Sequence, residues 1–199
     1  MIRVEPPLEP TGFDADVRKP GATWLANNAN RASRPPDRWT KYKGELADGF
    51  QNLCAYSAMY EPVGTVDHFV SVDENRALAY EWGNYRYASG WINSSKQSLK
   101  SDQMLDPFEI GDDWFEIILP SLQLQLSGSV PAEVKELAEF VVQRLHLRDD
   151  ERVIRQRREW YRLYQEGKLN LEGLRDMAPL IATAVEREQR NNDTEEAQE

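Results

Sequence analysis

The sequence predicts an α+β fold, and three observations support this prediction. Short segments rich in β-forming residues lie in the middle of the chain, at 60–85 and 114–126. Apolar residues recur at helical spacing over 37–53 and again from residue 131 onward. The chain has 199 residues, of which 40% are hydrophobic, so it can bury a real core and is not a wholly disordered chain.

The first 36 residues are predicted to form an extended, turn-rich lead-in, because they hold six of the eleven prolines. Pro35 and Pro36 then end this coil, and Asp37 is a plausible N-cap for a helix. A single apolar stripe at spacings of three and four predicts a helix of roughly four turns over 37–53. This stripe consists of Trp39, Tyr42, Leu46, Phe50 and Leu53.

Residues 37–128 are predicted to form the α+β core. The segments 65–70 and 79–82 are interpreted as the two strands of a hairpin, with a polar loop between them. Residues 85–100 favour a helix. The segments 114–119 and 122–126 alternate apolar and polar residues on either side of a proline, which predicts a second hairpin.

Residues 129–188 are predicted to be helical, with three helix starts. Pro131 suits a first helical turn, Asp149-Asp150 can open a second helix and Asn170 can cap a third. The last segment, 189–199, is predicted to be a disordered acidic tail.

The net charge of −10 is concentrated in two places. Residues 101–132 hold six acidic and no basic side chains, and the tail adds further acids. This balance argues against a general affinity for nucleic acid, which rewards a basic surface. The segment 31–43 is the exception, with five basic side chains and one acidic one. Its members Arg34, Arg38 and Lys41 are therefore candidate contacts to nucleic acid.

The sequence predicts neither a membrane-spanning segment nor an internal disulfide. No apolar run approaches the roughly 20 residues that a membrane-spanning helix needs. The first residues also lack the apolar stretch of a secretory signal. Cys54 is the only cysteine, which excludes an internal disulfide and a zinc site built from several thiolates. We therefore expect a cytoplasmic protein that does not associate with membranes.

Three short segments hold residues that could carry chemistry. They are Asp67-His68, Glu81-Trp82-Gly83-Asn84 and Asn93-Ser94-Ser95-Lys96. Read together, they resemble the HNH endonuclease superfamily, whose fold is the ββα-metal unit. The closer resemblance is to the HNH proteins found with retron and Septu-type antiphage defence systems. It covers most of residues 1–165, although only the block 54–96 is specific.

The sequence departs from this family at its zinc knuckle. The four positions of the knuckle correspond to Cys54, Ser57, Ser89 and Ile92, so one thiolate remains and no structural zinc is expected. The proline that the family places just after the histidine is also absent. The resemblance therefore implies a ββα-metal core whose zinc is replaced by packing or whose activity has drifted.

The resemblance also implies roles for individual residues. His68 would be the general base, and Asp67 with Asn93 would hold one divalent ion. Because both ligands are oxygen donors, magnesium or manganese is expected. Asn84 would fix the loop that orients His68. The phosphate charge would be stabilised by Lys96 or Arg86.

Two functions follow from these residues. The first is a metal-dependent DNA endonuclease in antiphage defence, which reaches DNA with the help of a partner ATPase or another defence protein. The alternative is a degenerate HNH-fold module that binds or assembles with a partner and does not cut. On its spacing alone, His68 in an apolar strand is also consistent with a buried structural histidine. If the side chains of Asp67, His68 and Asn93 lie within reach of one ion, the enzyme is favoured, whereas their separation favours the binding module.

Overall fold

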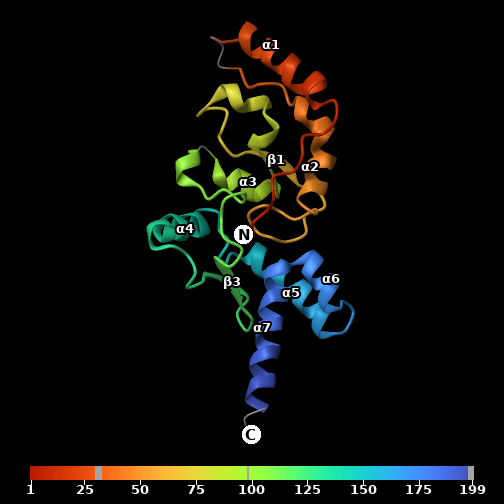
Figure 1. Cartoon of the computed structure of the whole chain (residues 1–199), viewed down its shortest axis with the longest axis vertical. Coiled ribbons are helices and arrows are strands. Elements are labelled where there is room, and N and C mark those ends of the chain that lie inside the picture. Colours follow the sequence, from red (N-terminus) through yellow and green to blue (C-terminus); the bar gives the residue numbers. More distant parts are fainter. Residues whose placement is uncertain (30–32, 98, 197–199) are drawn as a thin grey trace.

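The computed structural model describes residues 1–29, 33–97 and 99–196 and confirms a mixed α+β architecture. The elements are arranged along one long axis, with α1 at one end and α7 projecting at the other (Figure 1). Two antiparallel hairpins pair β1 with β2 and β3 with β4. The strands are β1 (Thr65–His68), β2 (Tyr85–Ala88), β3 (Phe115–Ile118) and β4 (Gln123–Leu126). The helices are α1 (Lys19–Asn27), α2 (Lys43–Gly49), α3 (Gly90–Lys96), α4 (Ala132–Arg144), α5 (Glu151–Gln165), α6 (Leu171–Met177) and α7 (Pro179–Glu196).

The N-terminal region is more helical than predicted. A π-helical turn at Asp14–Arg18 leads directly into α1, so the expectation of an extended segment over 1–36 is wrong for this part of the chain. Tertiary packing explains the difference. Val17 is completely buried, and a Cβ on Gly21 would lie only 2.3 Å from the Tyr80 ring. A glycine is therefore required for α1 to approach this ring.

The first hairpin is shifted relative to the prediction. The expected second strand at 79–82 falls on two 3₁₀ turns, Arg76–Tyr80 and Trp82–Asn84, and the true strand β2 follows them. All four residues of β2 are buried, so its sequence lacks the alternation that identifies a half-exposed strand. The helix predicted over 85–100 is thereby reduced to α3.

The predicted helix over 37–53 is also shorter than expected. A 3₁₀ turn at Arg38–Tyr42 precedes α2, which ends at Gly49. Asp37 does stand at the N-cap, but its side chain makes no capping hydrogen bond. Gln51 and Asn52 then adopt positive φ angles of 54° and 57°, which turns the chain away from the helix.

The second hairpin and the helical C-terminal region are confirmed, including two of the predicted caps. The Asp150 side chain accepts a hydrogen bond of 2.9 Å from the Arg152 amide, and Asn170 accepts one of 2.8 Å from the Gly173 amide. The last predicted helix is divided at Ala178 into α6 and α7.

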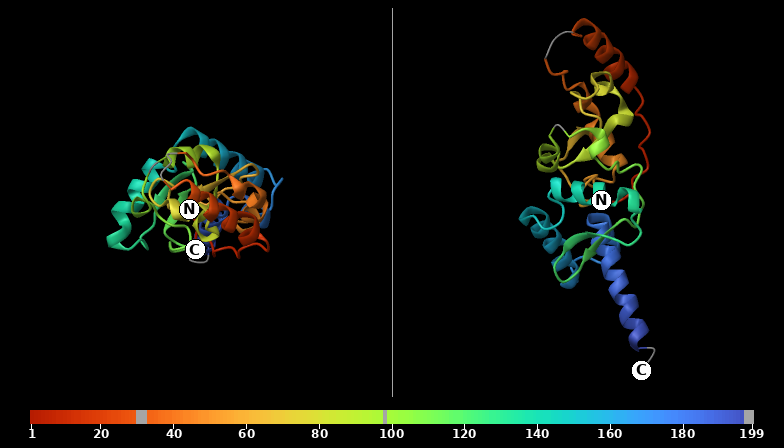
Figure 2. Two further views of the ribbon diagram at one scale, coloured as in Figure 1. Left: turned by 90° about the horizontal axis from the view of Figure 1, so that it is seen from above. Right: turned by 90° about the vertical axis from the view of Figure 1, so that its left-hand side faces the viewer.

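The tail predicted to be disordered over 189–199 is helical as far as Glu196. The run from residue 186 onward contains neither glycine nor proline and is rich in good helix formers, so nothing ends the helix there. Figure 2 shows that this part of α7 extends away from the other elements. Residues 197–199 lie outside the described part of the chain.

The two ends of the molecule share one hydrophobic core. Tyr60 joins them: its amide donates to Met177 O at 2.8 Å, and its carbonyl accepts from Gln156 Nε2 at 2.9 Å. A second contact joins α5 to α3, where the Arg152 guanidinium lies over the Trp91 ring at 4.1 Å from its centre. No helix among the described residues is long and apolar enough to cross a membrane.

Candidate functional site

A polar cavity of about 390 Å³ is bordered by four of the residues that the sequence singled out, Arg34, Asp67, His68 and Asn93. Asp67 and His68 from the end of β1 border it, and Asn93 from α3 borders the same space. The other polar residues around it include Ser71, Asp73, Arg76 and Gln97. The structure therefore brings the predicted base and the two predicted metal ligands to one cavity.

His68 is held by hydrogen bonding and by two aromatic rings. Its Nε2 lies 2.9 Å from Ala79 O, and because a carbonyl only accepts, Nε2 carries the hydrogen in this contact. The neutral ring thus keeps Nδ1 as its acceptor. Trp39 and Tyr85 contact the ring edge-to-face, with centroid separations of 4.5 and 5.1 Å. Burial lowers the pKa of His68 from its ordinary value of 6.5, so the ring is neutral at neutral pH.

Asp67 is directed away from His68, because successive residues of a strand point to opposite faces. Its carboxylate is buried and accepts hydrogen bonds from Lys96 Nζ at 2.9 Å on each oxygen. The hydroxyl of Tyr56 donates to the same carboxylate. Burial is the main cause that raises the pKa of Tyr56 well above 10, so this phenol keeps its proton. Asp67 is therefore enclosed by donors.

Asn93 lies one helical turn before Lys96 on α3. Its side-chain NH₂ donates to Thr65 Oγ1 at 3.1 Å, which joins α3 to the start of β1. Within the described ranges, its Oδ1 accepts no hydrogen bond from the protein. Asn93 thus keeps an oxygen that could bind a ligand in the cavity.

The predicted divalent-metal site does not fit these contacts. The carboxylate of Asp67 already holds an ammonium group, and a metal ion would have to displace it. Across the described residues, no group of three or more His, Cys, Asp and Glu side chains is placed to hold a metal.

Lys96 and Arg86, the two candidates for phosphate stabilisation, are both buried. Besides Asp67, Lys96 Nζ donates to His68 O at 2.6 Å and Phe69 O at 3.0 Å. Arg86 makes a two-pronged ion pair with Asp106, with Nε–Oδ1 and Nη2–Oδ2 distances of 2.8 and 2.5 Å. Both side chains are buried and held in ion pairs with carboxylates, which does not suit a role at an incoming phosphate.

Asn84 makes several hydrogen bonds to the backbone of the loop that follows His68. Its Oδ1 accepts from the Val70 amide at 2.8 Å, and its Nδ2 donates to Val70 O and Leu78 O at 2.9 and 3.2 Å. Its carbonyl also accepts from the Phe69 amide at 2.8 Å. Asn84 therefore fixes the backbone that follows His68.

Of the three basic residues predicted to contact nucleic acid, one lines the cavity. Arg34 borders the cavity, and its side chain is 79% exposed. Arg38 and Lys41 do not line the cavity, and Lys41 instead forms an ion pair with Asp16.

Arg76, which the sequence analysis did not single out, lines the cavity. It donates through Nη2 to Ser33 O at 2.8 Å, and its guanidinium lies 5.3 Å from the centre of the Trp24 ring. Its buried Nε makes no hydrogen bond to a described residue. Its place in the polar loop between Asp67-His68 and Asn84 was the signal that could have identified it.

Two positions of the degenerate zinc knuckle are in contact. The Ser89 amide donates to Cys54 Sγ at 3.3 Å, and both residues are buried. Ser57 and Ile92, at the other two positions, are buried as well. The four positions that correspond to the knuckle are thus buried, and an amide–thiol contact joins two of them.

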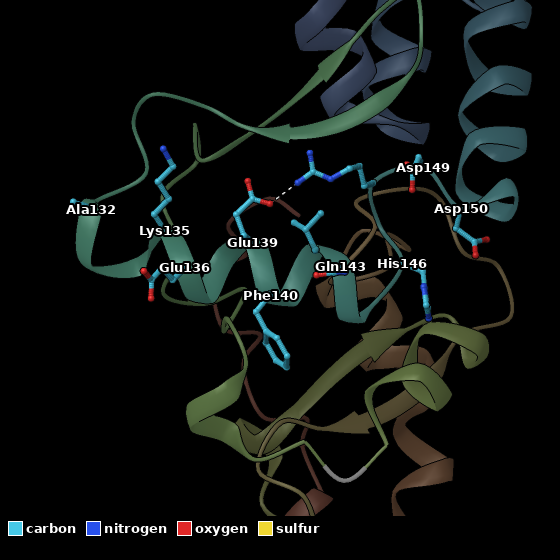
Figure 3. A pocket seen from close by; sticks show the side chains of 11 residues that line it. Ala132, Lys135, Glu136, Glu139, Phe140, Gln143, His146, Asp149 and Asp150 are labelled. Atoms are coloured by element: carbon cyan, nitrogen blue, oxygen red, sulfur yellow. Dashed lines mark hydrogen bonds and ion pairs between the residues drawn. The ribbon is translucent and has the colours of Figure 1, made fainter.

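A second cavity of about 890 Å³ lies along α4. Figure 3 shows Phe140 and His146 pointing to the same side of this helix, while Glu139 faces Arg148, with which it forms an ion pair. His146 follows the end of α4 and has a positive φ of 56°. The cavity contains none of the residues that the sequence analysis placed in a site.

No protein-family model matches the chain, and no curated protein is significantly similar to it.

Proposed function

We propose that this chain has an HNH-type scaffold and that its polar cavity binds the phosphate backbone of a nucleic acid without a divalent metal. The observation that carries the proposal is the contact between Lys96 and Asp67. In this contact the Lys96 ammonium engages both oxygens of the carboxylate that a metal-dependent nuclease would use as a metal ligand.

Three features support the HNH-type scaffold. The β1–β2 hairpin is followed directly by α3, and Asn93 bonds that helix to β1. Asn84 anchors the loop after His68, as the resemblance implies. Cys54 and Ser89, which correspond to zinc-ligand positions, touch each other.

The cavity offers suitable groups for a phosphate. Arg34 and Arg76 border it, and guanidinium groups bind phosphate oxygens by charge-assisted hydrogen bonds. Asn93 and Gln97 add amide groups from α3 and its end. The net charge of −10 makes the rest of the molecule unfavourable for DNA, so binding is expected to depend on this local group.

This proposal is tested by measuring the binding of a short fluorescent DNA duplex in EDTA at low salt. The double variant Arg34→Ala/Arg76→Ala should bind about tenfold more weakly, and the difference should shrink as salt is added. Arg155→Ala is the matched control, because Arg155 is an exposed arginine of α5 that is not part of the cavity. Equal affinities for the wild type and the double variant would contradict the proposal.

A second candidate function is the metal-dependent DNA endonuclease that the resemblance implies, acting in antiphage defence with a partner ATPase. The orientation of His68 favours it, because a neutral ring with Nε2 tied to Ala79 presents Nδ1 as a base. Plasmid cleavage with Mg²⁺ or Mn²⁺, compared between the wild type and His68→Ala, tests this candidate. Cleavage that is lost in His68→Ala would make the endonuclease the better account.

A further inference from the structure

The Lys96 side chain reaches four oxygen atoms at the end of β1. Its ammonium lies 2.9 Å from both oxygens of Asp67, 2.6 Å from His68 O and 3.0 Å from Phe69 O. Only 1% of the side chain is exposed. One charged carboxylate and two backbone carbonyls therefore surround a single buried cation, and all of the donors on this cation are engaged.

The arrangement of α3 explains why this cation reaches Asp67. Lys96 follows Asn93 by three residues, so both side chains lie on the same side of the helix. Asn93 bonds to Thr65, and Lys96 bonds to Asp67, two residues further along β1. Thr65 and Asp67 share one face of the strand, which is the face that α3 covers.

We propose that the Lys96 ammonium is the resident cation of this site and takes the position where a divalent metal would otherwise bind to Asp67. A metal ion and an ammonium on the same carboxylate would repel each other strongly in a buried place. The inference rests on the proposed HNH-type scaffold and deepens it. It implies that Asp67 and Asn93 bind no divalent ion while the Lys96 ammonium is present, and that removal of this ammonium would restore such a site.

The first test measures Mn²⁺ binding to the wild-type chain by electron paramagnetic resonance of the free ion. The wild type should leave added Mn²⁺ free. Binding of Mn²⁺ to the wild type that is lost in Asp67→Asn would overturn the inference, because the metal would then displace the ammonium. This readout does not involve DNA, so its failure is separate from any failure of the arginine variants.

The second test removes the ammonium with Lys96→Met, which keeps much of the side-chain volume. This variant should bind Mn²⁺ at least about tenfold more tightly than the wild type. The gain should vanish in Lys96→Met/Asp67→Asn. Lys135→Met, which removes a lysine of α4, should behave as the wild type.

Loss of the ion pair could also unfold Lys96→Met in EDTA. In that case the inference expects Mn²⁺ to restore the folded state, since a ligand that binds only the folded chain stabilises it. Circular dichroism would follow this recovery. An Lys96→Met chain that binds no Mn²⁺ when folded, or that Mn²⁺ does not refold, would contradict the inference.

Discussion

The Lys96 ammonium lies 2.9 Å from each carboxylate oxygen of Asp67, and both side chains are buried. We propose that this ion pair takes the position where the sequence resemblance implies a divalent metal. It connects α3 to β1, the two elements that carry Asn93 and His68 at the cavity.

Breaking this pair from one side should be costly. Lys96→Met leaves a buried and uncompensated carboxylate, so the free energy of unfolding should fall by about 3–5 kcal/mol. Lys96→Met/Asp67→Asn removes both charges and should recover part of that loss. Urea denaturation of the two single variants and the double variant measures the coupling. Losses that simply add up would show that the two groups do not interact.

The stability of the protein should depend on pH through His68. The unfolded chain binds a proton with the ordinary pKa of 6.5, whereas burial lowers the pKa in the folded protein. The unfolded state therefore binds more protons below about pH 6.5, and stability should fall as the pH decreases through that value.

Measuring the free energy of unfolding against pH for the wild type and His68→Gln checks this expectation. The wild type should lose more stability than the variant between neutral and mildly acidic pH. An identical pH dependence would show that the imidazole is not buried in its neutral form.

Asn84 should control the order of the segment after His68. Asn84→Ala removes three side-chain hydrogen bonds and leaves the amide and the carbonyl of the half-buried Val70 without their Asn84 partner, while Leu78 O keeps its hydrogen bond from the Glu81 amide. The free energy of unfolding should fall by about 2–4 kcal/mol. The Val70 amide should also exchange with deuterium faster, which NMR can follow. An unchanged exchange rate at Val70 would rule out the anchoring role.

The parts of the fold that the sequence predicted are those with local signals. The turn at Pro120 and the alternating segments around it predict β3 and β4. Asp150 and Asn170 are typical N-cap residues and indicate where α5 and α6 begin. Each of these signals lies within a few residues of the element that it specifies.

The parts that the sequence did not predict depend on distant contacts. The strand β2 is buried on both faces and shows no alternation, and α1 is stabilised by packing around Val17 and Gly21. The adjacency of Asp67 and His68 was visible in the sequence. The contact between Lys96 and Asp67 was not, because it depends on how α3 lies across β1.

The DNA affinity of the wild-type chain in EDTA, compared with its affinity in Mn²⁺, tests the central claim most directly. Because Lys96 already fills the cation position, the two dissociation constants should agree within about twofold at matched ionic strength. Binding at least about tenfold tighter in Mn²⁺, and lost in Asp67→Asn, would show that a metal does occupy the site and would contradict the account.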